Sequence, residues 1–377
     1  MSLTLTLASR NLFHDLLRFV ATMVGIVFSV VLVMVQMGLY LGFGHMVTTM
    51  IDHASTDLWI VPRGAKCFED PSLLDLKLRN KVATLDGVAT VVPLVIGFSD
   101  WRQDSGEMTP VFIVGADLRD RVLEPWNVTD GNVQNLSQGY SVAVDSSYFD
   151  RLGVTGVGST AEIRGKKVKV VALTDGIRSF TTTPYVFVDL KNARALTGTP
   201  GDRANDLLVR LNPNADRGKV VEAIRAQIGN AEVLTTAEFR ERSRSFWLFG
   251  TGAGAALFAG ALLGVIVGTV IVAQTLYSST KDHLNEFATL RAMGSSNRYI
   301  YNVIIYQALI NAVIGFAVAY GIGAVVVEAT AKSALPIVIT TWLVIALAAL
   351  TLVMCVTSAL GAIFRVVRID PATVFMR

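Results

Sequence analysis

Four long apolar runs dominate this chain of 377 residues. Each is longer than the ~20 residues that an α-helix needs to cross about 30 Å of hydrocarbon, and none contains Asp, Glu, Lys or Arg. One run precedes a long polar segment, and the other three follow it. The pattern predicts a membrane protein with four transmembrane helices in a one-plus-three arrangement. The predicted spans are residues 19–44, 246–276, 299–327 and 335–364.

The polar segment between the first and second spans, residues 45–245, predicts a folded domain. Short β-type runs alternate with helical patterns, and the segment is long enough for its own core, in one or two lobes. The predicted fold class is therefore α-helical membrane protein with four transmembrane helices plus a large α+β extracytoplasmic domain. Expected strands cover 57–61, 88–101, 109–115, 141–145, 161–164, 167–173, 184–188 and 206–211. Expected helices cover 73–85, 189–196 and 215–228.

Both ends of this domain predict helical stalks that continue into the membrane. The run Thr235-Thr236-Ala237-Glu238 fits a capping box, in which a hydroxyl and a carboxylate three residues later bond the free amides of a helix start. No proline interrupts the chain from Ala237 into the second span, and no breaker follows Gly44 up to Ala54. We therefore expect two continuous stalks, which are either simply long helices or stiff transmitters of motion.

Basic residues near the span ends predict the orientation. Eight Lys and Arg residues flank one side and four the other, which favours cytoplasmic termini. The expected cytoplasmic parts are an amphipathic segment 1–18, a loop 277–298 and a tail 365–377. The domain and a short loop 328–334 are then periplasmic. Because the first run exceeds the 7–15 residues of a signal-peptide core, we expect a retained anchor.

Small residues recur at four-residue spacing within the spans. Such rows let helix backbones approach closely, either within the chain or across a homodimer. Shorter rows occur in the first span (Gly38, Gly42) and the third (Gly315, Ala319, Gly323). The longest row is in the second span, and its predicted helix-packing residues are Gly254, Gly260, Gly264 and Gly268.

The charge distribution disfavours two classes of function, ion-coupled transport and nucleic-acid binding. Ion-coupled carriers usually place ionisable residues inside their spans, so the uncharged spans disfavour gradient-driven transport. A net charge of +3 without a long basic run does not indicate nucleic-acid binding. Cys67 in the domain and Cys355 in the last span are expected to lie apart, so no disulfide is predicted.

The cytoplasmic loop carries a short amphipathic pattern. Leu284, Phe287, Leu290 and Met293 recur every three residues and precede Gly294, a plausible helix C-cap. A short helix of this kind lies on the membrane surface or docks in a partner's groove, and the pattern alone leaves both open.

Catalytic patterns are absent from the sequence. It contains no G-x-x-x-x-G-K-[ST] phosphate loop, and no H-E-x-x-H, H-x-x-E-H or G-x-S-x-G pattern. We therefore predict no catalytic residue, bound cofactor or metal on this chain, and any ATP hydrolysis must occur on another subunit.

The loop sequence Glu286-Phe-Ala-Thr-Leu-Arg-Ala-Met-Gly294 resembles the E-(I/F)-(G/A)-x-L-(R/K)-A-x-G signature of FtsX-like, or MacB-type, ABC transporter permeases. The one-plus-three arrangement and the large domain after the first span resemble the family too. So do the opening Leu7–Leu12 and the ending, in which Asp370-Pro371 follows a basic stretch. The run Asp57–Gly64 and the lack of a fused ATPase are most similar to the DevC branch.

The resemblance implies a permease subunit of the bacterial inner membrane. Its implied partners are a cytoplasmic ABC ATPase that carries ATP and Mg, a second copy of itself, a periplasmic adaptor and an outer-membrane channel. It implies that ATP-driven motion passes through the spans and stalks to the outer domain. The implied ATPase-contact residues of this coupling helix are Leu284, Glu286, Phe287, Leu290, Arg291 and Met293.

Three functions stay open within this resemblance. The first is export with an adaptor and a channel, the second is lipoprotein release, and the third is transmembrane signalling of the cell-division type. The domain is larger than is typical of the third. The sequence does not identify the cargo.

Overall fold

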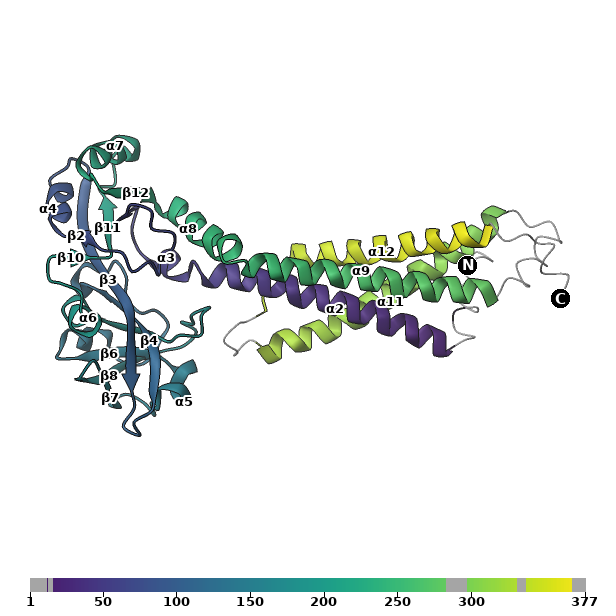
Figure 1. The fold of residues 1–377 in the computed structure, drawn as a ribbon, viewed down its shortest axis with the longest axis horizontal. Helices are drawn as coiled ribbons and strands as arrows, with labels where there is room; N and C mark the ends of the chain where they lie inside the picture. The colour runs from purple at the N-terminus through teal and green to yellow at the C-terminus, as the bar shows by residue number, and fades with distance from the viewer. Residues whose placement is uncertain (1–11, 13–15, 283–296, 331–336, 368–377) are drawn as a thin grey trace. The chain divides into compact units, whose positions relative to one another are not determined.

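The structure, a computed structural model, describes residues 12, 16–282, 297–330 and 337–367 (Figure 1). The chain divides into two compact units. The helical unit consists of Met1–Gly42 and Gly254–Arg377, and the α/β unit consists of Phe43–Ala253.

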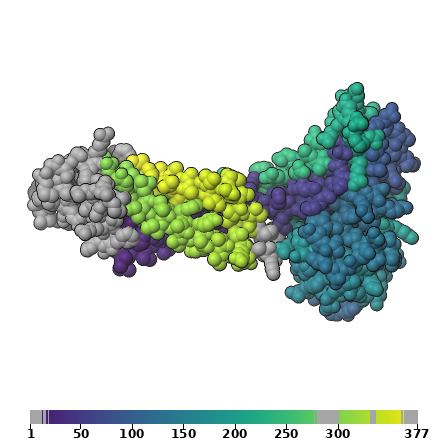
Figure 2. Space-filling model, turned by 180° about the vertical axis from the view of Figure 1, so that it is seen from behind, coloured from purple at the N-terminus to yellow at the C-terminus, as the bar shows by residue number. Residues whose placement is uncertain are grey.

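The helical unit contains four long apolar helices within the described residues. Each is long and apolar enough to cross a membrane, and α11 and α12 lie side by side along one face (Figure 2). The predicted fold class, with four such helices and a large domain between the first and second, is confirmed. The helices are α2 (Leu16–Met46), α9 (Ala253–Asp282), α11 (Asn297–Thr330) and α12 (Thr341–Val367).

The α/β unit is built on a mixed sheet of ten strands. Two neighbouring pairs, β4 with β9 and β6 with β8, are parallel, and the other pairs are antiparallel. The strand order is β12 (Ala231–Thr235), β1 (Leu58–Pro62), β11 (Asp206–Leu211), β3 (Val88–Arg102), β4 (Met108–Ala116), β9 (Tyr185–Asp189), β6 (Ser141–Asp145), β8 (Lys166–Thr174) and β5 (Val128–Gly131).

One lobe of the unit is a closed ring of strands. The short strand β7 (Thr160–Ile163) pairs with both β3 and β8, so that β3, β4, β9, β6, β8 and β7 surround one core. Trp101 is fully buried there, and its indole N–H donates to the carbonyl of Leu152 at 2.9 Å. The helices α5 (Phe149–Leu152) and α6 (Leu190–Thr197) complete this core.

The second lobe is an open sheet formed by β12, β1, β11 and the first half of β3, with helices on both faces. All five residues of β1 are buried, as expected for a strand covered on both sides. Leu58 and Ile60 pack toward α4 (Lys77–Ala83) and α7 (Arg217–Gln227), whereas Trp59 packs against Phe68 and Phe239 of α8 (Thr236–Ser245).

The secondary structure predicted for the domain needs one correction and several additions. The expected helix over 73–85 is wrong in its first part. Leu74–Asp75 instead forms strand β2, which pairs with β10 (Arg203–Ala204), and α4 begins after it. The Asp75 carboxylate accepts from the amide of Lys77, the first residue of α4, at 2.9 Å. The sequence reasoning also missed β5, β10 and β12.

The prediction of two continuous stalks is wrong as well. On the first side α2 ends at Met46, and a turn precedes the short helix α3 (Thr49–His53). The Thr48 hydroxyl lies 3.1 Å from the His45 carbonyl oxygen and 2.8 Å from an Asp52 carboxylate oxygen, and its one proton can be donated to either. Such a local side-chain bond competes with the regular helix.

On the second side α8 is followed by the π-helix η4 (Phe246–Gly250). The helix then breaks at Thr251 and Gly252 before α9 begins. Gly252 has φ of +77°, a left-handed conformation that glycine adopts without strain. The absence of proline between Ala237 and the second span was therefore not sufficient to predict one continuous helix.

The capping box at the start of α8 is confirmed and gives a testable expectation. Thr235 Oγ1 accepts from the Glu238 amide, and the Glu238 carboxylate accepts from the Thr235 amide at 2.7 Å. Thr235→Ala should lower the free energy of unfolding by about 1 kcal/mol, measured by urea unfolding of the purified full chain. Ser105→Ala, in the exposed turn between β3 and β4, is the control and should change it by less than about 0.5 kcal/mol. Equal effects would contradict a stabilising cap.

Candidate functional site

The glycines predicted to pack in the second span lie on α9. They are Gly254, Gly260, Gly264 and Gly268. The first is buried, and the other three face α2 of the same chain. A Cβ atom at Gly264 would lie 3.1 Å from Val33, and one at Gly268 would overlap Ser29. Ser29 Oγ also donates to the Gly264 carbonyl at 2.6 Å, a contact that only a close backbone approach permits.

The glycines of the third span also face α2. A Cβ atom at Gly315 would lie 2.6 Å from Ile26, and one at Gly323 would overlap Met34. Ile26 and Met34 are almost completely buried. Helix α2 therefore packs against glycine-rich surfaces of both α9 and α11.

The predicted ATPase-contact residues lie outside the described residues. These are Leu284, Glu286, Phe287, Leu290, Arg291 and Met293. Their contact with an ATPase stays a prediction from the sequence.

The α/β unit joins its two stalk segments to each other by polar contacts. Arg240 of α8 forms an ion pair with Asp52 of α3. Three residues further along α8, the Ser243 hydroxyl donates to the Val47 carbonyl at 3.3 Å, and Ser243 is fully buried. Arg240 lies close to the start of the predicted second span, and this ion pair gives it a structural role.

A segment after β1 runs along α8 and η4, and we call residues 63–70 the strap. At its start the Gly64 amide donates to Glu232 at 3.1 Å, and Arg242 of α8 bridges Glu232 (2.7 Å) and the Ala65 carbonyl (3.3 Å). Lys66 lies over the ring of Phe246, 5.7 Å from its centroid. The strap therefore contacts successive turns of the stalk helix.

The strap ends in an acidic side chain between the sheet and the π-helix. Trp247 Nε1 of η4 donates to one Glu69 oxygen at 3.1 Å, and the Tyr185 hydroxyl of β9 donates to the other at 3.4 Å. Burial raises the pKa of the Glu69 carboxyl from 4.5 to about 7, although the hydrogen bonds oppose this shift. No Lys, Arg or His among the described residues forms an ion pair with Glu69.

Aromatic rings enclose the other side of Trp247. Phe180, from the segment between β8 and β9, lies 4.4 Å from Trp247 and 5.3 Å from Phe43, measured between ring centroids. Met46 and Val47 complete this apolar cluster. Residues of both stalk segments and of the sheet connection thus meet at one place, which we call the stalk junction.

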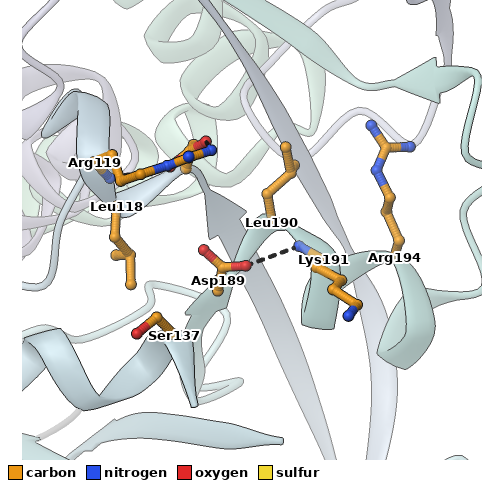
Figure 3. Close-up of a pocket in the computed structure, with 8 residues that line it drawn as sticks. Leu118, Arg119, Ser137, Asp189, Leu190, Lys191 and Arg194 are labelled. Atoms are coloured by element: carbon orange, nitrogen blue, oxygen red, sulfur yellow. Dashed lines mark hydrogen bonds and ion pairs between the residues drawn. The ribbon is translucent and has the colours of Figure 1, made fainter. Parts of the chain in front are cut away.

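A separate hollow lies near the start of α6 (Figure 3). Its volume is about 520 Å³. Arg119 pairs with Asp117 at 2.6 Å, Asp189 accepts from the Lys191 amide at 3.2 Å, and Arg194 donates to two nearby carbonyls. These groups stabilise local structure and do not form a set of free ligands. The lining residues are Asp117, Leu118, Arg119, Ser137, Asp189, Leu190, Lys191 and Arg194.

The described part of the chain offers no metal or disulfide chemistry. It contains no group of three or more His, Cys, Asp or Glu side chains that could hold a metal ion. Cys67 and Cys355 are both buried free thiols. Burial raises the pKa of Cys67 to about 12, which makes it a poor nucleophile near neutral pH.

The sequence reasoning missed the main residues of the stalk junction. Glu69, Trp247 and Phe180 have no periodicity in common, because they come from a loop, a π-helix and another loop. One feature of the sequence could have indicated that Glu69 lies near the core: it directly follows Cys67 and Phe68, and both residue types are often buried.

These features define a class of protein: a chain with four helices that are long and apolar enough to cross a membrane, and with a large α/β domain between the first and the second. The family of the MacB-like periplasmic core domain matches residues 19–227, and the FtsX-like permease C-terminal family matches residues 256–371. The chain therefore belongs to the MacB/FtsX-like family of ABC transporter permeases, as the sequence motifs predicted. This is a family of permeases of the inner membrane and not of enzymes, and it implies an ATPase partner. A search of curated proteins finds no match.

Two solved structures are similar to about half of this chain. The periplasmic region of MacB from Actinobacillus actinomycetemcomitans is 11% identical, with a TM-score of 0.38, and the match covers 50% of this chain and 92% of that one. The extracellular domain of the ABC-type transporter YknZ from Gram-positive bacteria is 15% identical, with a TM-score of 0.36, and the match covers 48% of this chain and 98% of that one.

Proposed function

We propose that this chain is the permease subunit of an ABC-type exporter and transmits the motion of a separate cytoplasmic ATPase to its periplasmic domain. A second copy of the chain completes the permease. Both termini and the loop 277–298 lie in the cytoplasm, so that the domain faces the periplasm. The family membership supports this proposal, and so does the absence of a phosphate loop from the sequence.

The stalk junction is the observation that carries the mechanical part of the proposal. Motion of the second span reaches the domain through η4 and α8, and these helices are bonded to the sheet through Glu69 and Tyr185 and to α3 through Asp52. Phe239 of α8 is fully buried against Trp59 of β1. A displacement of α8 therefore cannot leave the sheet unchanged, because closely packed interiors transmit strain.

In this proposal the ATPase acts on the permease through the helix predicted in the cytoplasmic loop 277–298. The apolar side chains Leu284, Phe287, Leu290 and Met293 fill a groove of the ATPase. Glu286 and Arg291 set the register through charge-assisted hydrogen bonds.

Outside the membrane the domain engages a periplasmic adaptor and an outer-membrane channel, as in the DevC branch. The uncharged spans support a mechanism in which cargo is handled by the outer domain and does not pass through the spans.

The test is affinity purification of the chain from native membranes in mild detergent, followed by mass spectrometry. Export predicts a stoichiometric ABC ATPase together with a periplasmic adaptor. An ATPase with a lipoprotein chaperone would favour lipoprotein release, and an ATPase with a cell-wall hydrolase would favour signalling. The proposal is wrong if no ATPase is recovered by the purification and crosslinking in intact membranes captures none either.

A further inference from the structure

The connection between β8 and β9, which we call the arm (residues 175–184), reaches from the ring-shaped lobe to the stalk junction. Phe180 lies in its turn and is buried. The phenyl group contacts Phe43, at the end of α2, with 5.3 Å between ring centroids, and Trp247 of η4, with 4.4 Å. One side chain of the arm therefore contacts both stalk segments.

The base of the arm is fixed to the ring-shaped lobe by hydrogen bonds. The Ile177 amide donates at 2.7 Å to the carboxylate of Asp145, the last residue of β6. The Ser179 amide donates at 3.1 Å to the hydroxyl of Tyr148, which belongs to the core of this lobe. Because the arm is held up to Ser179, movement of its tip requires a change in the backbone of the turn that follows, residues 180–183.

Thr182 in this turn has a strained backbone. Its φ of +61° lies in the left-handed region, which a β-branched residue rarely adopts. Contacts hold this conformation on both sides: the Thr182 amide donates to the Ser179 carbonyl at 2.9 Å, and the Arg151 guanidinium donates to the Thr182 carbonyl. In the part of the chain that the structure describes, no other β-branched residue has a positive φ. Strain of this kind persists only where the surrounding structure imposes it.

We propose that Phe180 is a strained wedge: inserted between the two stalk segments it holds them together, and the strain at Thr182 favours its withdrawal. Burial of the phenyl group and its contacts with Phe43 and Trp247 favour insertion. The left-handed backbone of Thr182 opposes insertion by a free energy of similar size. The inserted and withdrawn states are then close in stability, so a small displacement of either stalk segment shifts the population between them.

Withdrawal of the wedge leaves the stalk segments connected to each other. The ion pair between Arg240 and Asp52 and the hydrogen bond from Ser243 to the Val47 carbonyl join the two segments directly, without the arm. Loss of the Phe180 contacts therefore loosens the stalk junction and does not unfold it.

The consequence for transport rests on the proposed function. An inserted wedge makes the ring-shaped lobe follow the stalk segments, whereas a withdrawn wedge lets them move without that lobe. The wedge itself is tested on the purified chain without ATPase, adaptor or cargo, so its failure and that of the proposed function are distinguishable.

The experiment measures how often Phe180 leaves the stalk junction. Met46 belongs to the same apolar cluster as Phe180 and is 8% exposed. The full chain carries Met46→Cys together with Cys67→Ser and Cys355→Ser, so that the only thiol is at position 46, and it is purified in lipid nanodiscs. The rate at which a maleimide probe labels this thiol is measured at constant pH. This rate rises with the population of the withdrawn state, because a buried thiol reacts only when the structure around it opens.

Thr182→Gly should lower the labelling rate about fivefold, because glycine adopts the left-handed conformation without strain and so stabilises the inserted state. Thr182→Asn should lower the rate as well, since asparagine tolerates this conformation without the backbone freedom of glycine. Phe180→Ala should raise the rate more than about tenfold, because the buried phenyl group is lost. The proposal is overturned if neither Thr182 variant lowers the rate.

The matched control is Arg164→Gly. Arg164 also has a left-handed backbone, with φ of +47°, but it lies in the exposed turn between β7 and β8 and outside the arm. The change relieves backbone strain at a different place, so the labelling rate should change less than about twofold. An equal fall with Arg164→Gly and Thr182→Gly would indicate general stabilisation of the unit and would refute the wedge.

A double variant shows whether the strain acts through the phenyl group. In the chain that carries Phe180→Ala, adding Thr182→Gly should change the labelling rate less than about twofold, since no wedge is left to insert. A fall of about fivefold in this background would mean that Thr182 acts independently of Phe180, which contradicts the proposal.

Discussion

Leu290→Asp is expected to abolish binding of the ATPase while the chain still folds in the membrane. The residue lies in the apolar stripe predicted for the loop between the second and third spans. An aspartate there would have to be buried, uncompensated, in an apolar groove, and an uncompensated buried charge costs about 3 kcal/mol or more. Binding should therefore weaken by more than about a hundredfold. The measurement is the amount of ATPase recovered with the affinity-tagged chain.

The matched control is Asn285→Asp. It adds the same charge to the helix that the sequence predicts, but on the side opposite the stripe, so ATPase recovery should be nearly unchanged. Normal recovery with Leu290→Asp would refute the docking assignment. Loss with both variants would show that negative charge anywhere on the loop prevents binding, which also contradicts a groove specific for the stripe.

Gly268→Leu is expected to disrupt the helical unit. Even a Cβ atom at this position would overlap Ser29 of α2, and Met354 of α12 lies 3.0 Å away. The larger side chain would force α9 from α2 and break the hydrogen bond from Ser29 to the Gly264 carbonyl. The cost should reach or exceed the upper end of the about 1–3 kcal/mol that overpacking usually causes. We expect a large fall in the yield and thermal stability of the purified chain.

The control for this variant is Gly321→Leu in α11. Gly321 is exposed, and a Cβ atom added to it would have no other atom within 4 Å, so this change should leave the yield nearly normal. Both glycines lie within apolar helices, and the comparison therefore separates loss of close packing from a general effect of leucine. Equal yields for the two variants would contradict the tight α9–α2 contact.

The hydrophobic pattern was sufficient to predict most of the architecture. Long uncharged runs have few alternatives to membrane helices, because every backbone polar group must be satisfied within the span. Within the domain, β-type runs such as 141–145 and 206–211 correspond to β6 and β11. Such strands can be predicted from their own residues, because their β-prone side chains must be buried. The capping box at Thr235 is equally local, and it too was predicted.

The stalk junction required the tertiary structure. Its contacts join Glu69 to Tyr185 and Trp247, which are 116 and 178 residues away along the chain. No periodic pattern encodes a meeting of a loop, a strand and a π-helix. The break at Gly252 was equally hidden, since glycine inside an apolar run is compatible with either a helix or a turn.

The sequence by itself determined the class of protein, the four spans and the family, because these depend on composition, on periodicity and on a short motif in one loop. Only the tertiary structure decided that the second-span glycines face α2, that the sheet closes into a ring through β7, and that a carboxyl group lies between sheet and stalk. These properties depend on which distant segments meet. The pKa of Glu69 is raised for the same reason: burial, and not the residues next to it in the chain, sets the balance between its two protonation states.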